Sequence, residues 1–435
     1  FALFEDNANE HCETCKILQQ LTPKYINANS TEQQIRQFVQ VSCQLIPTSL
    51  QKNCFGFMQS YNQSFVNYLL VAKTTKDICY AIGSCQTNYW QTLLRARQSP
   101  ENKTGACQLA AMYYDTERKI LFAGGGSDLQ QKITKPQMFK SMDKGQTWEI
   151  VYNASQATFS MYGFQKLNDG SYVFIGDNGL IRSTDGGMTF FKDKRDFKNL
   201  AMSTLYVNGT LFISQKKGSY IRSSDNLKTF ETIKLTDNKV DNLRSMAYID
   251  GAIFFGVDYL ANEPDHLHES RIYKSIDGGN TFKNVFKANG YKDEGQSLFA
   301  MVGLGNGVVL AGTGAALGKE MKIYRSINGG ETFNLSFDLT QLDTSLKIVR
   351  SFTVAKNGTV YAAFDCSYAS KKHWMDDQPD ENKNSQIWQS YDQGKTWQFH
   401  SRTNTKRLYW MIFDEQEVEF FASTGEYGEV KTFKK

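Results

Sequence analysis

The chain has 435 residues, of which 40% are hydrophobic and 13% aromatic, so it can bury a sizeable core in two or three domains. Its 49 basic and 45 acidic residues leave a net charge of +4 without a basic or acidic tail, which argues against nucleic acid as a partner. No apolar run approaches the ~18 residues that a membrane-spanning helix needs.

The cysteines and the glycosylation sequons indicate an oxidising, secretory environment. Six of the eight cysteines lie within the first 85 residues, and a start at Phe1 instead of Met is typical of a processed chain. The sequons lie at Asn29, Asn62, Asn102, Asn153, Asn208, Asn334 and Asn357. We expect a glycoprotein that is secreted or located in the endolysosomal lumen; a cytosolic protein with spare cysteines is the alternative.

Two amphipathic stretches within the first 88 residues predict helices. The first, STEQQIRQFVQVSCQLI, has Ser30 or Thr31 as its N-cap and a glutamine three residues later, as in a capping box; Pro47 ends it. Its buried face should consist of Ile35, Phe38, Val39, Ser42 and Leu45. The second stretch, NQSFVNYLLVAK, predicts another short helix. A segment this small needs covalent bridges to be stable.

The first six cysteines are spaced C-x2-C-x27-C-x10-C-x24-C-x5-C. A zinc site at the C-x2-C pair would require a second close pair of ligands, and C-x5-C without a nearby histidine is a poor one. We therefore expect disulfide bonds, although spacing alone does not select among the fifteen possible pairings.

In this spacing, with a proline between the third and fourth cysteines, residues 1–88 resemble the saposin B-type domain. The resemblance implies the bridges Cys12–Cys85, Cys15–Cys79 and Cys43–Cys54. It also implies a leaf of helices that binds lipid or a membrane surface, or that dimerises around lipid. Residues 1–85 carry six acidic and six basic side chains, so attraction to anionic lipid is not expected at neutral pH. The alternative is a structural cap on the neighbouring domain.

Six copies of an octet, S-x-D-x-G-x-T-W/F, follow at steps of 40 to 64 residues. We expect each to form a tight turn in which the aspartate accepts backbone hydrogen bonds, the glycine supplies an unusual backbone angle and the aromatic residue packs between sheets. The third copy has Leu227 in place of the glycine. The aspartate position is occupied by Asp143, Asp185, Asp225, Asp277, Asn328 and Asp392.

A second hairpin precedes each octet. Asn-Gly or Asp-Gly between apolar runs, as in YVNGTLFI, is a strong signal for a two-residue turn. Five hairpins carry this signal, and YYDTERKILFA and MIFDEQEVEFFA occupy the same place with longer turns. Seven hairpins and six octets predict a unit of four antiparallel strands, A to D, repeated about seven times, which is a β-propeller. The octets resemble the Asp-box, or bacterial neuraminidase repeat (BNR), of sialidase-like and sortilin-like propellers. That resemblance is specific for the fold and says little about function.

The expected architecture is therefore a small disulfide-bonded helical domain followed by an all-β propeller with seven blades or, alternatively, six. The expected domains are 1–88, saposin B-like; 89–104, a linker or closing strand; and 105–435, the Asp-box propeller. The last unit lacks its strand D, and residues 89–104 are our candidate for that place, because closing the ring removes exposed sheet edges.

The long, irregular segments of the propeller fall almost entirely between strands B and C, on the face opposite the octets, where loops of such length are usually functional or mobile. Cys107 and Cys366 both fall on this face, so we expect them to form a disulfide; two buried thiols are the alternative. The catalytic candidates in these loops are Asp258, Glu263, Asp376 and Asp377. The ligand-binding candidates are Tyr259, His266, His268, His373 and Trp374. His-x-His with nearby carboxylates suits a divalent metal, but a charged surface loop explains the same residues, so we expect no metal and no cofactor.

A standard sialidase is not expected, because the Arg-Ile-Pro motif that precedes the first Asp-box in that family does not occur in this chain. A glycosidase of another kind needs only two carboxylates at a suitable separation, which the sequence cannot measure.

Three functions therefore compete. The one we expect is a lipid-associated binding protein, whose propeller recognises glycan or protein on its long-loop face while the saposin domain contacts lipid. The alternatives are a glycoside hydrolase acting on glycolipid or glycan, and a structural subunit of an extracellular assembly that forms a homo-oligomer.

Overall fold

A computed structural model gives the structure of the chain. It describes residues 2–72, 75, 78–82, 84–85, 90–96, 108–126, 136–154, 161–176, 179–193, 195, 197, 199–237, 241–259, 269–289, 297–314, 321–339, 348–366, 384–403, 405, 407–414, 420–424 and 429–433.

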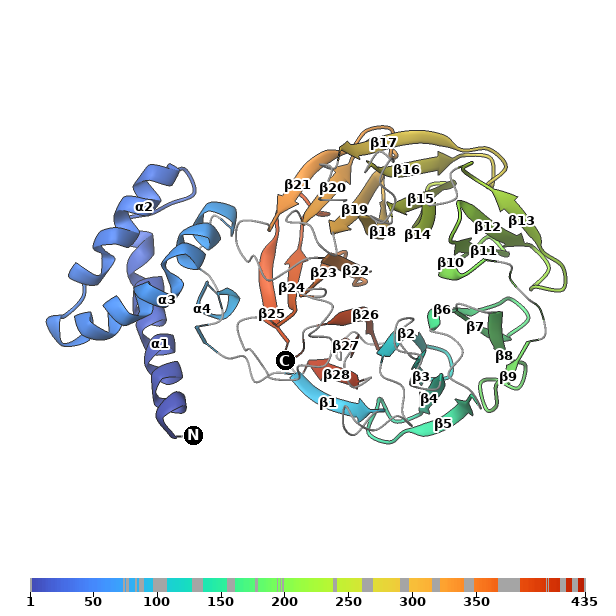
Figure 1. Cartoon of the computed structure of the whole chain (residues 1–435), viewed down its shortest axis with the longest axis horizontal. Coiled ribbons are helices and arrows are strands. Elements are labelled where there is room, and N and C mark those ends of the chain that lie inside the picture. Colours follow the sequence, from blue (N-terminus) through green and yellow to red (C-terminus); the bar gives the residue numbers. More distant parts are fainter. Residues whose placement is uncertain are drawn as a thin grey trace.

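Helices come first and strands follow, in two separate regions of space (Figure 1). The helical elements are α1 (Ala2–Leu21), η1 (Thr22–Lys24), α2 (Glu32–Val41), η2 (Ser42–Gln44), α3 (Thr48–Ala72) and α4 (Ile78–Ala81). The inner half of the strands, those that are first or second in their sheets, are β2 (Gln108–Asp115), β3 (Ile120–Gly126), β6 (Met161–Lys166), β7 (Tyr172–Gly176), β10 (Ala201–Val207), β11 (Thr210–Gln215), β14 (Asp241–Ile249), β15 (Ala252–Tyr259), β18 (Ser297–Gly305), β19 (Val308–Gly314), β22 (Ile348–Val354), β23 (Val360–Asp365), β26 (Leu408–Phe413) and β27 (Phe420–Thr424). The outer half are β4 (Gln137–Ser141), β5 (Glu149–Asn153), β8 (Gly179–Ser183), β9 (Phe191–Lys192), β12 (Ser219–Ser223), β13 (Glu231–Lys234), β16 (Glu269–Ser275), β17 (Lys283–Asn289), β20 (Lys322–Ser326), β21 (Asn334–Asp338), β24 (Gln386–Ser390), β25 (Gln398–Arg402), β28 (Glu429–Phe433) and β1 (Trp90–Arg95). None of the described helices has the length and apolarity that crossing a bilayer requires.

Helix α2 begins with a capping box at Thr31 and Gln34. The Gln34 backbone N–H donates to Thr31 Oγ1 over 3.3 Å, and the Thr31 N–H donates to Gln34 Oε1 over 2.8 Å. Its predicted apolar residues Ile35, Phe38 and Val39 are buried.

The helix boundaries after α2 differ from the prediction. The α-helix ends at Val41 and continues as a 3-10 turn, which carries Leu45 off the buried face and leaves it 41% exposed. The predicted second helix is the later half of the 25-residue α3, which starts directly after Pro47.

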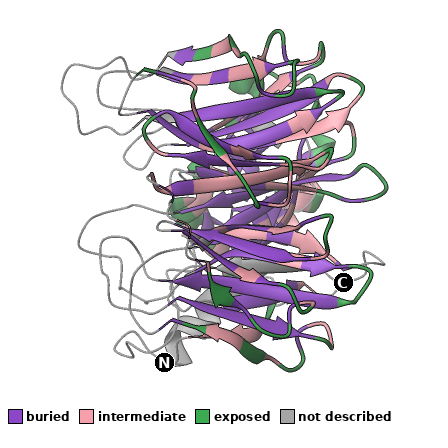
Figure 2. Ribbon diagram, turned by 90° about the vertical axis from the view of Figure 1, so that its right-hand side faces the viewer, coloured by how far each residue is buried: buried purple, intermediate pink, exposed green. Residues whose placement is uncertain are grey.

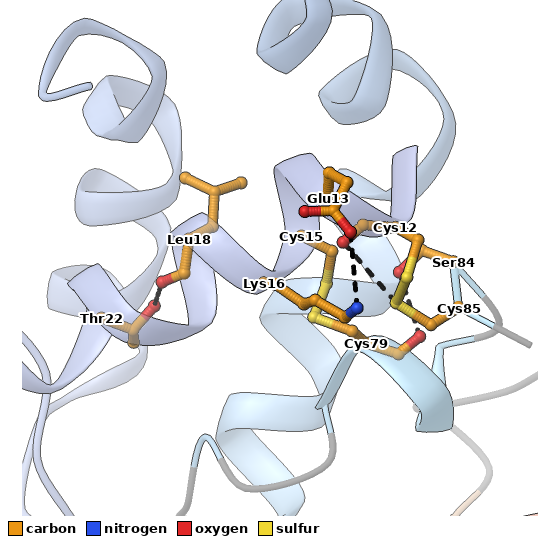
Figure 3. Close-up of a disulfide and its surroundings, with 9 residues drawn as sticks. All are labelled: Cys12, Glu13, Cys15, Lys16, Leu18, Thr22, Cys79, Ser84 and Cys85. Atoms are coloured by element: carbon orange, nitrogen blue, oxygen red, sulfur yellow. Dashed lines mark hydrogen bonds and ion pairs between the residues drawn. A yellow bond between two sulfur atoms is a disulfide. The ribbon is translucent and has the colours of Figure 1, made fainter. Parts of the chain in front are cut away.

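Three disulfides hold the helices together. Cys12–Cys85 and Cys15–Cys79 join α1 to the segment that contains α4 (Figure 3). Cys43–Cys54 joins η2 to α3. These are the pairs that the saposin resemblance implies. Such bridges stabilise mainly by restricting the unfolded chain, which suits a domain too small to rely on its apolar core.

The strands form five four-stranded antiparallel sheets and one of eight strands. The eight-stranded sheet consists of two groups of four, β18–β21 and β22–β25, joined by the single pair Gly314↔Ile348. The described strands therefore make seven groups of four, which Figure 1 shows around a ring. The innermost strands of neighbouring groups contact each other in a closed cycle. This is the arrangement of a β-propeller.

The last sheet is completed by a strand that precedes the propeller in the sequence. Strand β1 pairs with β28, from Trp90↔Phe433 to Arg95↔Glu429, and gives that sheet the order β26-β27-β28-β1. Of the two roles expected for residues 89–104, the structure thus has a closing strand at Trp90–Arg95.

Each octet forms the turn between the third and fourth strands of its sheet. In the fourth copy, Asp277 Oδ1 accepts from the Ser275 hydroxyl (2.7 Å) and the Thr281 N–H (3.0 Å), and Oδ2 accepts from the Thr281 hydroxyl (2.6 Å). Asn328 reproduces this pattern, with its Nδ2 donating to Thr332 Oγ1 over 2.8 Å. The turn therefore tolerates Asn in place of Asp.

The octet glycine touches the preceding sheet. At Gly330, φ is +80° and an added Cβ would lie 2.3 Å from the ring of Phe254. Leu227 takes the same position in the third copy, also at positive φ, and is fully buried. The preceding sheet there offers Val173 where the others offer Phe or Leu, and Val173 and Leu227 belong to one apolar cluster. The smaller neighbour makes room for the larger turn residue.

The helical domain packs against the outer strands of one propeller sheet (Figure 1). Tyr68 of α3 contacts Trp388 of β24, and Gln386 and Arg402 both donate to the backbone carbonyl of Ala81 in α4. The buried residues of both sides form a single apolar cluster. Figure 2 shows that burial otherwise follows the strands, while exposed residues gather at the turns.

Candidate functional site

Each innermost strand of the propeller has a break in its pairing register near its first residue. In β14 the register shifts between Leu243 and Ser245, so that Arg244 is skipped. The other six innermost strands have the same shift at the corresponding place. The seven skipped residues are Ala110, Tyr162, Met202, Arg244, Phe299, Arg350 and Tyr409. Such bulges bend the strand and re-aim a side chain, and they are frequent next to functional sites.

All seven bulge residues line one cavity of about 260 Å³. Because they come from every innermost strand, the cavity lies at the centre of the ring. We call these seven residues the bulge ring. The volume is just below the range of ~300–1,000 Å³ for complete small-molecule pockets, so the cavity suits a small ligand or one group of a larger one.

The bulge ring lies toward the face on which the sequence places the long loops. Strand β14 starts opposite the end of β15, at Asp241↔Tyr259, and β16 starts at that same edge. The connection from the second to the third strand of a sheet therefore leaves from the edge where the bulge occurs. The octet turns lie at the opposite edge.

Two arginines of the bulge ring share one aromatic neighbour. The guanidinium carbon of Arg244 lies 4.3 Å from the centroid of the Phe299 ring, and that of Arg350 lies 5.1 Å from it. Arg350 is also 5.1 Å from the ring of Tyr409. Cation–π contacts of this kind hold the planar guanidinium in place without using its N–H donors.

A buried ion pair orients Arg350. Its Nε donates to Asp365 Oδ2 over 2.8 Å, and the two side chains are 9% and 0% exposed. A buried charge of this kind is stable only when it is paired and hydrogen-bonded. Asp365 therefore fixes the plane of the guanidinium group at the cavity wall.

The rest of the described lining combines apolar side chains with the hydroxyl groups of Ser203, Thr204, Ser245 and Ser351. Met246, Met301, Phe352 and Trp410 contribute apolar surface, and the described lining includes no Asp or Glu. Ser351 adds a hydroxyl that is buried and has no hydrogen-bond partner among the described residues.

Most of the candidates named from the sequence lie outside the described residues: Glu263, His266, His268, Asp376, Asp377, His373 and Trp374. Asp258 and Tyr259 end β15, where only their backbone is described; they pair with Asn242 and Asp241 at the start of β14. Their strand positions are therefore close to Arg244, and their roles remain predictions. No cluster of three or more potential metal ligands occurs in the described part of the chain.

The octet carboxylates are held by local hydrogen bonds. The hydroxyl and the amide of Thr147 donate to Asp143 and lower its pKa to about 2, and Thr229 does the same for Asp225. These carboxylates stay ionised and accept hydrogen bonds from their own turns, so they act as structural groups.

The remaining predicted modifications are tested only in part. Six of the seven sequon asparagines are exposed, while Asn102 lies outside the described residues. Their glycosylation remains a prediction. Cys366 is buried, but Cys107 is outside the described residues, so their disulfide also remains a prediction.

The bulge ring was not found from the sequence. Its members sit in ordinary apolar strands, such as IVRSFTV around Arg350 and DNLRSMAY around Arg244. The available signal was an arginine near the start of two of the strands that are first in their sheets. It becomes visible only when the seven first strands are aligned on the turns that follow them.

Comparison with known proteins supports two different relationships. No family model matches the chain. Chicken (Gallus gallus) prosaposin is 29% identical over 77 residues, which are 18% of this chain and 15% of prosaposin. This chain thus matches only a small part of the length of prosaposin. The match lies in the N-terminal, helical part of this chain.

Solved structures match the strands. The structure of YCF48 bound to D1 peptide aligns with a TM-score of 0.52 and 14% identity, covering 81% of this chain and 96% of that one. The extracellular domain of a putative one-component system from B. thetaiotaomicron aligns with a TM-score of 0.55 and 10% identity, covering 78% and 40%. At such identities the likeness shows the fold alone. The helical part of the chain is therefore a saposin-like domain, and the part that follows is a β-propeller.

Proposed function

We propose that the chain is a lipid-associated binding protein, in which the saposin-like domain contacts lipid and the propeller recognises a protein partner at its central cavity. The observation that carries this proposal is the bulge ring, because seven equivalent bulges aim side chains of every sheet at one cavity. A secreted or endolysosomal location accords with the three disulfides.

The chemistry of the lining favours a protein ligand over a glycan. Arginine, methionine and aromatic residues, which line this cavity, are the residue types enriched at protein interfaces. Methionine side chains adapt to apolar groups of different shapes. A sugar would require many hydrogen-bonding partners for its hydroxyls, but the Ser245 hydroxyl of the lining already donates to the Leu298 carbonyl, and the Thr204 hydroxyl already accepts from Gln165. The similar YCF48 propeller binds a peptide, which is compatible with this choice.

Exposed apolar side chains of the helical domain support the contact with lipid. Val41 and Leu45 flank Cys43, and Phe55 follows Cys54; the Cα atoms of these two cysteines are 5.5 Å apart. The disulfide therefore gathers three side chains that are 39%, 41% and 48% exposed. Since the charges of residues 1–85 balance, binding should depend on this apolar surface more than on anionic lipid.

Flotation of the full chain with vesicles tests the lipid contact. We expect it to float with phosphatidylcholine vesicles, with little further gain from phosphatidylserine. The double variant Leu45→Ser/Phe55→Ser should lose most of this binding. Ile276→Ser is the matched control, because Ile276 is an equally apolar and 79% exposed residue on the propeller. Equal flotation of the double variant and the wild type would overturn this part of the proposal.

Selection of ligands tests the propeller. Ala110, the smallest member of the bulge ring, can be replaced by Phe to fill the cavity while leaving both arginines in place. Panning a random peptide library on the wild type and on Ala110→Phe should enrich peptides only on the wild type. Enrichment of glycans from an array with no peptide selected, or release of sugar from them, would contradict protein recognition and favour a glycan receptor or a glycoside hydrolase.

A further inference from the structure

We propose that the bulge ring binds a carboxylate group of the peptide ligand, held between Arg244 and Arg350. This inference rests on the proposed function and specifies the group that is recognised. The carboxylate can be a free C-terminus or an Asp or Glu side chain, since both present the same two oxygens to the cavity.

Both guanidinium groups lie beside the ring of Phe299. Both contact its ring, at 4.3 Å and 5.1 Å, and both line the same cavity. A guanidinium offers its N–H donors in a planar fork that matches the two oxygens of a carboxylate. Two such groups beside one aromatic neighbour bring guanidinium donors from two strands to the same cavity.

The described environment strengthens this attraction. Met246, Met301 and Phe352 give the cavity walls an apolar part, and a charge–charge interaction is stronger beside it than in water. The cavity lining that the structure describes contains two cationic side chains and no carboxylate. Asp365 accepts a hydrogen bond from Arg350 Nε and so orients this cation, and it is not itself part of the described lining.

Ser351 provides an independent observation. It is 7% exposed, it lines the cavity beside Arg350, and its hydroxyl has no hydrogen-bond partner in the described part of the chain. The large majority of buried side-chain polar atoms have a hydrogen-bond partner. An oxygen of the bound carboxylate would accept this hydrogen bond.

The apolar residues of the lining indicate which kind of peptide side chain lies next to the carboxylate. Met246, Met301 and Phe352 lie among the lining residues next to the arginines in their strands or in the strand between them. They suit an apolar side chain close to the carboxylate. The volume of about 260 Å³ accommodates one end or one side chain of a peptide and excludes a folded domain.

Three sets of fluorescein-labelled random hexapeptides test the proposal by anisotropy with the full chain. The first set has a free C-terminus and no Asp or Glu; the second is the same but amidated; the third is amidated and carries one internal Glu. We expect the first or third set to bind at least about tenfold more tightly than the second. The better of the two identifies the source of the carboxylate.

Variants assign that preference to the bulge ring. Arg244→Gln should weaken binding of the better carboxylate-bearing set, the first or the third, about tenfold or more, and Ser351→Ala should weaken it a few-fold. Neither variant should change binding of the second set, which carries no carboxylate. Arg36→Gln is the matched control, because Arg36 is a half-exposed arginine of the helical domain. Since Arg350→Gln alone leaves Asp365 buried without this partner, Arg350 is tested as the pair Arg350→Gln/Asp365→Asn.

The outcomes separate this inference from the function on which it rests. Equal binding of all three sets, or unchanged binding by Arg244→Gln, would overturn carboxylate recognition while leaving peptide recognition intact. If no set binds and Ala110→Phe changes nothing, both the inference and the propeller's proposed function are wrong.

Discussion

The ring of Tyr68 in α3 lies against that of Trp388 in β24, with their centroids 6.0 Å apart, and both side chains are fully buried. The helical domain is therefore packed on the propeller by a core contact and does not depend on a linker alone. Hydrogen bonds from Gln386 and Arg402 to the Ala81 carbonyl lie beside this contact. The exposed side chains of Val41, Leu45 and Phe55 and the central cavity consequently keep a fixed orientation to each other.

Replacing Tyr68 by Ala should separate the two domains thermodynamically. The substitution removes a fully buried aromatic ring, for which we expect a loss of about 3–5 kcal/mol in unfolding free energy. Thermal unfolding followed by calorimetry should change from one transition to two, as the helical domain melts first. Phe55→Ala, at an exposed aromatic residue of the same helix, should leave the profile unchanged. A single, unshifted transition in Tyr68→Ala would contradict the packing described above.

The nested disulfides should not contribute independently. Cys12–Cys85 closes a loop of 73 residues, but Cys15–Cys79 already closes most of that loop. Replacing Cys12 and Cys85 by Ser should therefore cost about 3 kcal/mol instead of the ~4.4 kcal/mol that the isolated loop implies, whereas removal of both bridges should cost about 7 kcal/mol. Denaturant unfolding of the single and double knock-outs measures this difference, and strict additivity would count against it.

The octet aspartates should make stability depend on acid pH. The pKa of Asp143 is lowered to about 2 from an ordinary value of 3.8, because Thr147 donates to the charged form. Between these values the unfolded chain binds more protons than the native one, so stability falls as pH is lowered from about 4 to 2. Denaturant unfolding across this range should show a shallower fall for Asp143→Asn. The natural Asn328 turn shows that this substitution preserves the turn.

Arg350 and Asp365 should behave as a coupled pair. Arg350→Gln leaves a fully buried carboxylate without its guanidinium, so we expect a loss of about 3–5 kcal/mol. The added change Asp365→Asn should recover most of this loss, because the buried charge is removed. Urea unfolding of the two single variants and the double variant gives the coupling energy. Additive losses in the double variant would show that the ion pair does not govern stability here.

Substitutions of Val173 and Leu227 should be tolerated only when they are made together. Leu227→Gly leaves a cavity and should cost about 2–5 kcal/mol, while Val173→Phe overfills the same space and should cost about 1–3 kcal/mol. The double variant recreates the pair of large strand residue and turn glycine found at Phe254 and Gly330. We expect it to be more stable than either single variant, as judged by thermal unfolding.

The fold could be predicted because its signals are local. Each octet encodes its own turn through Asp, Gly and Thr, and the saposin resemblance supplied the disulfide pairs. The helix boundaries were less predictable, because the turn after Val41 and the length of α3 depend on packing around the Cys43–Cys54 bridge and not on apolar periodicity.

The candidate site could not be predicted because it is a property of the closed ring. Arg244 and Arg350 are more than a hundred residues apart in the sequence, and each looks like an exception in an apolar strand. Only the shared bulge and the circular order of the sheets bring both to Phe299. The loop residues Glu263, His266 and Asp376, chosen from the sequence for their chemistry, stay predictions.

The pairing of β1 with β28 also determines when this protein can finish folding. Arg95 and Glu429, which bond across that pair, are separated by 334 positions. During synthesis β1 is made early, and its edge stays unpaired until β28 has been made. A chain that is truncated before β28 would therefore have an incomplete last sheet and an exposed edge strand next to its helices. Premature termination should thus produce aggregates, and not a shortened protein that stays in solution.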